Sequence, residues 1–198
     1  MKIRKLFKTK TSVGSEEVSK KYGGLIKQLD LDSFWSSLTE DERSFIRRSC
    51  KHSFGITFPL SEVDAPESQL KTRRDTSSFL IGCAAWAIEG NKYGLAEKLL
   101  LTSIDHAQDI TSVHSAYHWL IKMHDHLRVS NIQSTKDCIV FCKSDIEILP
   151  LLQKELYSKG RSVQRVISIN VLLSIYKELG LKEEFNELYE LGSYYDAL

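Results

Sequence analysis

Residues 172–192 have the sequence Leu-Leu-Ser-Ile-Tyr-Lys-Glu-Leu-Gly-Leu-Lys-Glu-Glu-Phe-Asn-Glu-Leu-Tyr-Glu-Leu-Gly. Apolar residues in the first half recur three or four positions along, which places them on one side of an α-helix. They are Leu172, Ile175, Tyr176 and Leu179. Gly180 follows this stripe, and a glycine there can take the left-handed conformation that ends a helix. A second helix beginning near Lys182 would complete an antiparallel helical hairpin, because short connections make consecutive helices neighbours.

Similar stripes extend back along the chain to about Thr76. No proline, the strongest helix breaker, occurs between residues 67 and 149. The expected helices are Ser77–Glu89, Leu95–His106, Thr111–Leu127, Thr135–Leu149, Val163–Leu179 and Lys182–Tyr194, with a short helix after Pro150. Sustained strand alternation and the Asn-Gly or Asp-Gly turns of hairpins are absent from the sequence. We therefore predict an all-α fold.

The first 75 residues are less regular. Thr39 and Glu42 have the spacing of a capping box, in which each side chain bonds the backbone amide of the other residue. We also expect a helix over Glu16–Leu29 and a short helix capped by Asp32. The predicted organisation is a flexible basic arm at 1–14, an N-terminal helical cap region at 15–58, a connecting segment at 59–75 and a helical-repeat domain at 76–198.

Two segments, 172–192 and 84–103, resemble each other and resemble the tetratricopeptide repeat. In the first segment the large, aromatic, turn and small positions of the repeat correspond to Leu172, Tyr176, Gly180, Tyr189 and Gly192. Phe185 departs from the pattern, because the repeat has a small residue there. In the second segment the matching residues are Ala85, Ala96, Leu100 and Ser103. The resemblance covers residues 76–195 and implies antiparallel helical hairpins stacked as a short right-handed α-solenoid, with an N-terminal helical cap.

Composition excludes several classes of protein. The chain has 198 residues and a formal net charge of +1, which argues against broad coating of nucleic acid or a membrane surface. No apolar run approaches the roughly 20 residues that a membrane-spanning helix needs. The basic start is not followed by a long apolar stretch, so we expect no secretory signal. The four cysteines do not form a disulfide-dense pattern, which favours reduced thiols and a cytoplasmic location.

Five of the six histidines lie between residues 106 and 126, and they suggest a metal site. His114 and His118 are four residues apart and share a helical face. Cys138 and Cys142 have the same spacing on the helix expected to be the antiparallel neighbour. Two such pairs facing each other could form a tetrahedral zinc site. The same residues also fit a packing role, since free cysteine behaves as a small buried apolar side chain.

A second hypothesis concerns catalysis. Helical phosphohydrolases of the His-Asp family hold a divalent ion with one histidine, a His-Asp pair and a distant aspartate. The corresponding residues here would be His106, His124, Asp125 and Asp145. A metal held by them would lower the pKa of a bound water and create a nucleophile. Phosphate-binding glycine loops, nucleophile elbows and His-Glu-x-x-His motifs are missing from the sequence, so we expect no catalytic residues and no cofactor.

Charge is distributed unevenly. The N-terminal arm and residues up to 21 hold seven basic side chains, whereas the last eighteen residues are mostly acidic. This asymmetry suggests either an arm that contacts nucleic acid or head-to-tail self-association, set against an ordinary solvated tail. Overall charge makes nucleic acid the less favoured partner, and we expect no contact with membranes.

The leading hypothesis is a non-catalytic interaction module that binds a peptide, a partner protein or another copy of itself. Aromatic side chains on the inner side of a helical stack would anchor the partner, since buried aromatics dominate binding energy. The candidate partner-binding residues are Trp86, Tyr117, Trp119, Arg161, Arg165 and Tyr176. The alternatives are the metal-dependent phosphohydrolase and a nucleic-acid-associated accessory protein that uses the basic arm.

Overall fold

The described part of the chain is helical. The computed structural model describes residues 22–54, 58–162 and 166–195, and these ranges contain no β-strand. The N-terminal unit consists of α1 (Gly24–Gln28), α2 (Asp32–Ser37), α3 (Glu40–Phe54) and the 3₁₀ helix η2 (Leu60–Val63). The rest consists of α4 (Thr76–Glu89), α5 (Tyr93–His106), α6 (Ile110–Leu127), α7 (Ile132–Glu147), α8 (Leu149–Ser158), α9 (Ile167–Leu179) and α10 (Lys182–Tyr194). The prediction of an all-α fold is confirmed.

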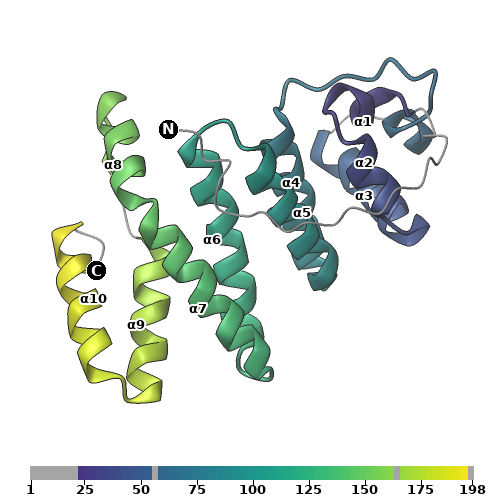
Figure 1. The fold of residues 1–198 in the computed structure, drawn as a ribbon. Helices are drawn as coiled ribbons and strands as arrows, with labels where there is room; N and C mark the ends of the chain where they lie inside the picture. The colour runs from purple at the N-terminus through teal and green to yellow at the C-terminus, as the bar shows by residue number, and fades with distance from the viewer. Residues whose placement is uncertain (1–21, 55–57, 163–165, 196–198) are drawn as a thin grey trace, which may run out of the picture.

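From α4 onward the helices pack in chain order along a row (Figure 1). Helix α4 packs on α5, α5 on α6, α6 on α7, α7 on α9 and α9 on α10. Two contacts skip one helix of the row, because α4 also touches α6 and α6 also touches α9. Helix α8 leaves the row and packs against α6 and α7. The unit α1–α3 lies at the end of the row next to α4 (Figure 1).

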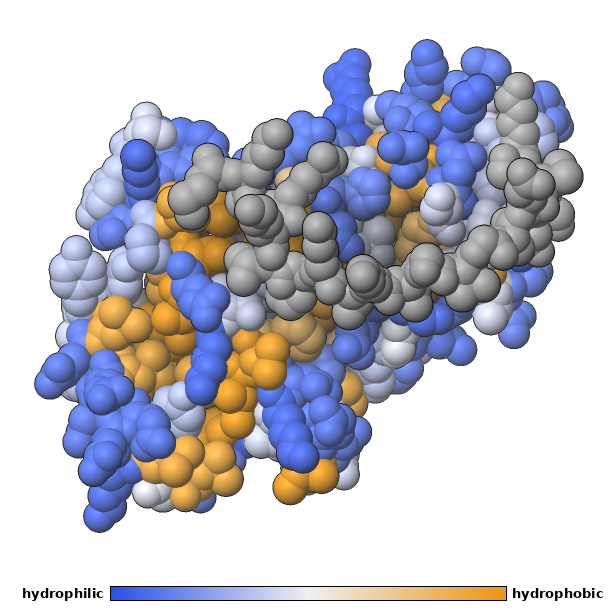
Figure 2. Space-filling view, in the orientation of Figure 1, coloured by the Kyte–Doolittle hydropathy of each residue, from blue (hydrophilic) through white to orange (hydrophobic). Residues whose placement is uncertain are grey.

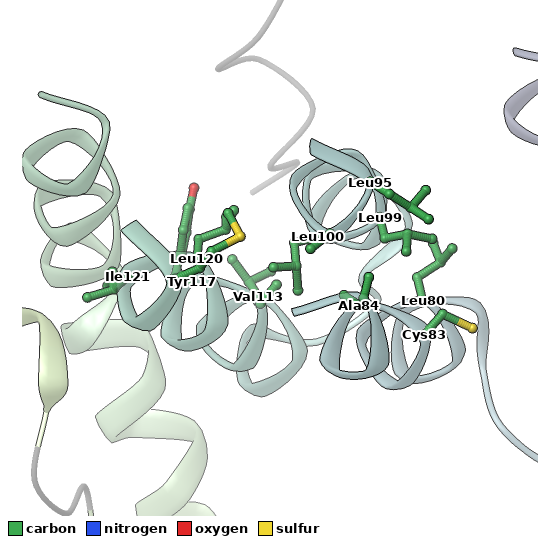
Figure 3. Close-up of a cluster of buried hydrophobic side chains, with 14 of the residues drawn as sticks. Leu80, Cys83, Ala84, Leu95, Leu99, Leu100, Val113, Tyr117, Leu120 and Ile121 are labelled. Carbon is green, nitrogen blue, oxygen red and sulfur yellow. The ribbon is translucent and has the colours of Figure 1, made fainter. Parts of the chain in front are cut away.

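Apolar stripes of neighbouring helices form one continuous core. Figure 3 draws buried side chains of α4, α5 and α6 that belong to this core, including Leu80, Cys83, Ala84, Leu95, Leu99, Leu100, Val113, Tyr117, Leu120 and Ile121. Toward the C-terminal end the core continues through buried residues of α9, including Ile169, Leu172 and Ile175. Burying such a stripe is what stabilises each amphipathic helix, because an isolated helix of this length is marginal in water.

The N-terminal unit is organised around one buried carboxylate. The indole Nε1 of Trp35 donates to Asp64 at 2.9 Å, and Arg47 donates to the same carboxylate through Nε at 2.9 Å and Nη2 at 2.6 Å. Gly24 has φ +54°, and a Cβ there would collide with the carbonyl oxygen of Glu62. Position 24 therefore requires glycine. The bonds to Asp64 join α2, α3 and the residue that follows η2.

The predicted helix caps are confirmed in part. Glu42 accepts from the Thr39 amide at 2.8 Å, and Thr39 accepts from the Glu42 amide at 3.2 Å, which confirms the capping box. Asp32, expected to be a cap, is instead the first residue of α2 and makes no capping bond. The expected helix over Glu16–Leu29 is helical only at 24–28 within its described part; its residues 16–21 lie outside the described residues.

The boundaries of α7, α8 and α9 also differ from expectation. Helix α7 begins at Ile132, because the side chain of Asn131 caps it by accepting from the Gln133 amide at 2.9 Å. It ends at Glu147, and α8 begins at Leu149 with Pro150 in its first turn. Proline is tolerated there because the N–H of a first-turn residue has no acceptor within the helix. Helix α9 begins at Ile167, and residues 163–165 of its expected first turn lie outside the described residues.

Candidate functional site

A buried carboxylate joins three helices of the row. Asp145, in the last turn of α7, has an exposed fraction of 0%. One of its oxygens lies 2.7 Å from Nδ1 of His114 on α6, and the other accepts the hydroxyl of Ser168 on α9 at 2.7 Å. A carboxylate buried without such partners would be very costly, so the three side chains stabilise one another.

Helix α9 contributes more than the serine hydroxyl. Its N-cap residue, Val166, makes no side-chain capping bond, and the amides of a first helical turn have no partner within the helix itself. Ser168 lies in that first turn, which places the Asp145 carboxylate near the positive end of the helix dipole. This end favours negative charge. The sequence therefore provides the buried carboxylate with a donor histidine, a donor hydroxyl and a favourable helix terminus.

The two ring nitrogens of His114 have different surroundings: Nδ1 faces the buried Asp145, and Nε2 does not. An ionised carboxylate only accepts hydrogen bonds, so Nδ1 of His114 must be the donor to Asp145. The side chain of His114 is 21% exposed, and its Nε2 has no hydrogen-bond partner among the described residues. In the neutral ring this tautomer has its lone pair on Nε2, which is not among the buried unsatisfied atoms of the described residues.

His118 lies one helical turn beyond His114 and is half-buried. Burial lowers the pKa of His118 below the ordinary histidine value, and the nearby His114 and Lys122 lower it further. The ring of His118 packs edge-on against Trp119, with ring centres 6.3 Å apart. Two imidazoles thus occur four residues apart on one side of α6.

The two cysteines proposed as zinc ligands point into the core. Cys138 and Cys142 are both fully buried on α7, and the Cys138 thiol lies 3.9 Å from the carbonyl oxygen of Ile121. Interaction with the Cys138 thiol and burial raise the pKa of Cys142, so its thiol stays protonated. Within the described ranges no three His, Cys, Asp or Glu side chains come together as a metal site. The four-ligand zinc arrangement is therefore not assembled.

The residues considered for a phosphohydrolase do not converge either. The His124 ring is buried against Phe141, with ring centres 5.2 Å apart. Asp125 accepts from Nε of Arg128 at 2.7 Å, and Asp145 is occupied as described above. His106 is the last residue of α5 and is half-buried.

The partner-binding candidates divide by burial. Tyr117 and Tyr176 are buried and belong to the core. Trp86 on α4 is 36% exposed, and Trp119 on α6 is half-buried with the Lys122 ammonium 5.2 Å from its ring centre. Arg161 is exposed in the segment after α8, and Arg165 lies outside the described residues.

Two surface hollows lie near the N-terminal unit. One of about 300 Å³ contains the Trp86 candidate and is lined by Phe45, Arg48, Ser49, Trp86, Glu89 and Gly90. A larger one of about 630 Å³ borders the Arg47–Asp64 ion pair and is lined by Tyr22, Ser44, Arg47, Leu60, Ser61, Asp64, Ala65 and Pro66. Figure 2 shows apolar surface over the C-terminal part of the row. The exposed large apolar side chains between the end of α6 and the end of α9 include Val129, Ile132, Val140 and Leu179.

Sequence reasoning missed Ser168 and the Arg47–Asp64 pair. Ser168 is 23 residues from Asp145, and Asp64 is 17 residues from Arg47. Serine, arginine and aspartate at such separations have no local pattern that marks them as partners. Asp145 was considered only as a metal ligand, because its burial depends on how α7 and α9 pack.

Comparison of the chain with protein family models, curated proteins and solved structures found no match. Among the described residues, no helix combines the length and apolar character needed to cross a membrane.

Proposed function

We propose that the chain is a non-catalytic interaction module, in which the helix pairs α4–α5, α6–α7 and α9–α10 form a short right-handed α-solenoid like that of tetratricopeptide repeats. One observation carries this proposal: the first helices of the three pairs touch one another directly, α4 with α6 and α6 with α9. Stacked hairpins of this kind place their first helices side by side along one extended surface, which repeat proteins use for binding.

The proposed binding face lies on those three first helices. Helix α4 presents Trp86, and α6 presents Trp119 beneath Lys122. On α9 the exposed side chains Ser174 and Lys177 lie one turn apart. Partly exposed tryptophans beside charged residues are typical of binding surfaces, because the ring supplies apolar area while the polar neighbours orient the partner. A peptide or a helix of a partner protein is the occupant that an elongated face of this kind fits best.

The test uses a photo-crosslinking amino acid placed in the full chain. One variant carries it at position 119 on α6, and a matched variant carries it at position 157 on α8, where Tyr157 is 64% exposed. In cells of the source organism we expect the same protein to be crosslinked at 119 and not at 157, and Trp86→Ala to reduce that crosslink. Equal crosslinking at both positions, or a strictly monomeric chain with no crosslinked species, would count against the proposal.

A further inference from the structure

The paired imidazoles on α6 have an arrangement that a packing role does not require. His114 and His118 are four residues apart, so their rings lie on the same side of the helix one turn apart. Nδ1 of His114 bonds one carboxylate oxygen of Asp145, and the other oxygen accepts the hydroxyl of Ser168. A carboxylate that accepts the Nδ1 proton of a histidine fixes the ring and its tautomer, and it raises the basicity of Nε2. This carboxylate–histidine pair is the usual support of a metal-binding imidazole.

We propose that His114 and His118 bind a divalent transition-metal ion of the class that prefers imidazole, such as Zn²⁺, Ni²⁺ or Cu²⁺, and that Asp145 is the positioning residue of the site. His114 supplies Nε2, since its Nδ1 is engaged by Asp145. No third metal-ligating side chain joins them among the described residues, so water or a group from a binding partner completes the coordination. Hard ions such as Mg²⁺, which prefer oxygen ligands, are not expected to bind.

Burial supports the same ligand pair. Asp145 is fully buried and His114 is 21% exposed, so solvent does not compete strongly for the bond between them. His118 is half-buried and lies one helical turn from His114, so both rings are presented on the same side of α6. Cys138 and Cys142 take no part, because both thiols are buried in the core.

The first experiment measures Zn²⁺ binding to the full chain by isothermal titration calorimetry, with any histidine tag removed. We expect one Zn²⁺ per chain, loss of that binding in His114→Ala and in His118→Ala, and no binding of Mg²⁺. His126→Ala removes an exposed histidine of the same helix and is the matched control that should bind as the natural chain does. Binding that survives either His114→Ala or His118→Ala would overturn the site.

The second experiment counts the ligands. Electron paramagnetic resonance of the chain loaded with one Cu²⁺ should show coupling to two imidazole nitrogens, and this signal should be absent in His118→Ala. Asp145→Asn should weaken Zn²⁺ binding by about 10- to 100-fold and should alter the Cu²⁺ spectrum while circular dichroism stays unchanged. If Asp145→Asn fails to fold, Ser168→Ala tests the same support and should shift the spectrum in the same direction. An unchanged spectrum in a folded variant would refute the positioning role.

Discussion

At the scale of single residues, His124 is an unusual core residue. It is only 4% exposed, yet neither ring nitrogen has a hydrogen-bond partner, and the nearest carboxylate oxygen, on Glu97, is 4.0 Å from Nε2. An unsatisfied buried polar group costs stability. Burial also lowers the pKa of His124 below its ordinary value of 6.5, with Glu97 and Asp137 acting in the opposite direction.

This predicts a stabilising substitution whose effect depends on pH. The unfolded chain binds the His124 proton more readily than the folded chain, so this residue lowers stability as the pH falls through about 6.5 and below. His124→Leu should raise the free energy of unfolding by roughly 1 kcal/mol at pH 7.5, and by more at pH 5. Urea denaturation at both pH values measures this. His126→Leu changes an exposed histidine of the same helix and is the matched control.

Substitution of Asp145 should have the opposite effect on the free energy of unfolding. Removing one member of a buried, hydrogen-bonded pair leaves the others without a partner, so Asp145→Ala should lower the free energy of unfolding by about 3 kcal/mol. Ser168→Ala removes a single neutral donor and should cost only about 1 kcal/mol. Urea denaturation at pH 7.5 compares the two variants. Losses of equal size would show that the carboxylate does not hold the three helices together.

At the scale of helices, two glycines should respond in opposite ways to alanine. Gly180 ends α9 with φ +71°, and Gly94 is the second residue of α5; a Cβ at either position would meet nothing within 4 Å. Gly180→Ala should therefore cost about 1 kcal/mol through backbone strain alone. Gly94→Ala should gain roughly 0.5 to 1 kcal/mol, because alanine is the better helix former. Thermal melting of both variants, which should shift in opposite directions, is the measurement.

Helices and caps were predictable because their signals are local. The stripe of Leu172, Ile175 and Tyr176 lies within one helix, and the capping box of Thr39 and Glu42 spans four residues. The break between α7 and α8 was predicted at Pro150, and the structure places it slightly earlier, at Ile148. The chain turns at Ile148 with nearly helical backbone angles, φ −90° and ψ −7°, and no glycine marks the place. Periodicity carries through such a bend, so the sequence predicted two helices without fixing the residues at which α7 ends and α8 begins.

At the scale of the whole molecule, the contacts that place one helix against another were not predictable. Arg128 donates to Asp125 on its own helix and with both terminal nitrogens to Glu178 on α9, which is 50 residues away. His114 and Asp145 are 31 residues apart. These pairs come together only where the apolar stripes pack the helices against one another. The candidate site therefore depends on tertiary packing and not on a local sequence motif.

The row of helices predicts graded local stability. Helix α6 packs against α4, α5, α7, α8 and α9, whereas α10 packs mainly against α9. In a stack held by nearest-neighbour contacts, an end helix opens without disturbing the middle. Hydrogen exchange followed by mass spectrometry should therefore show the slowest amides in α6 and α7 and markedly faster exchange in α10. Phe185→Ala, which trims apolar packing on α10, should speed exchange there and leave α6 unchanged. If α10 exchanged as slowly as α6, the chain would unfold as a single cooperative unit, and nearest-neighbour packing could not be the source of its stability.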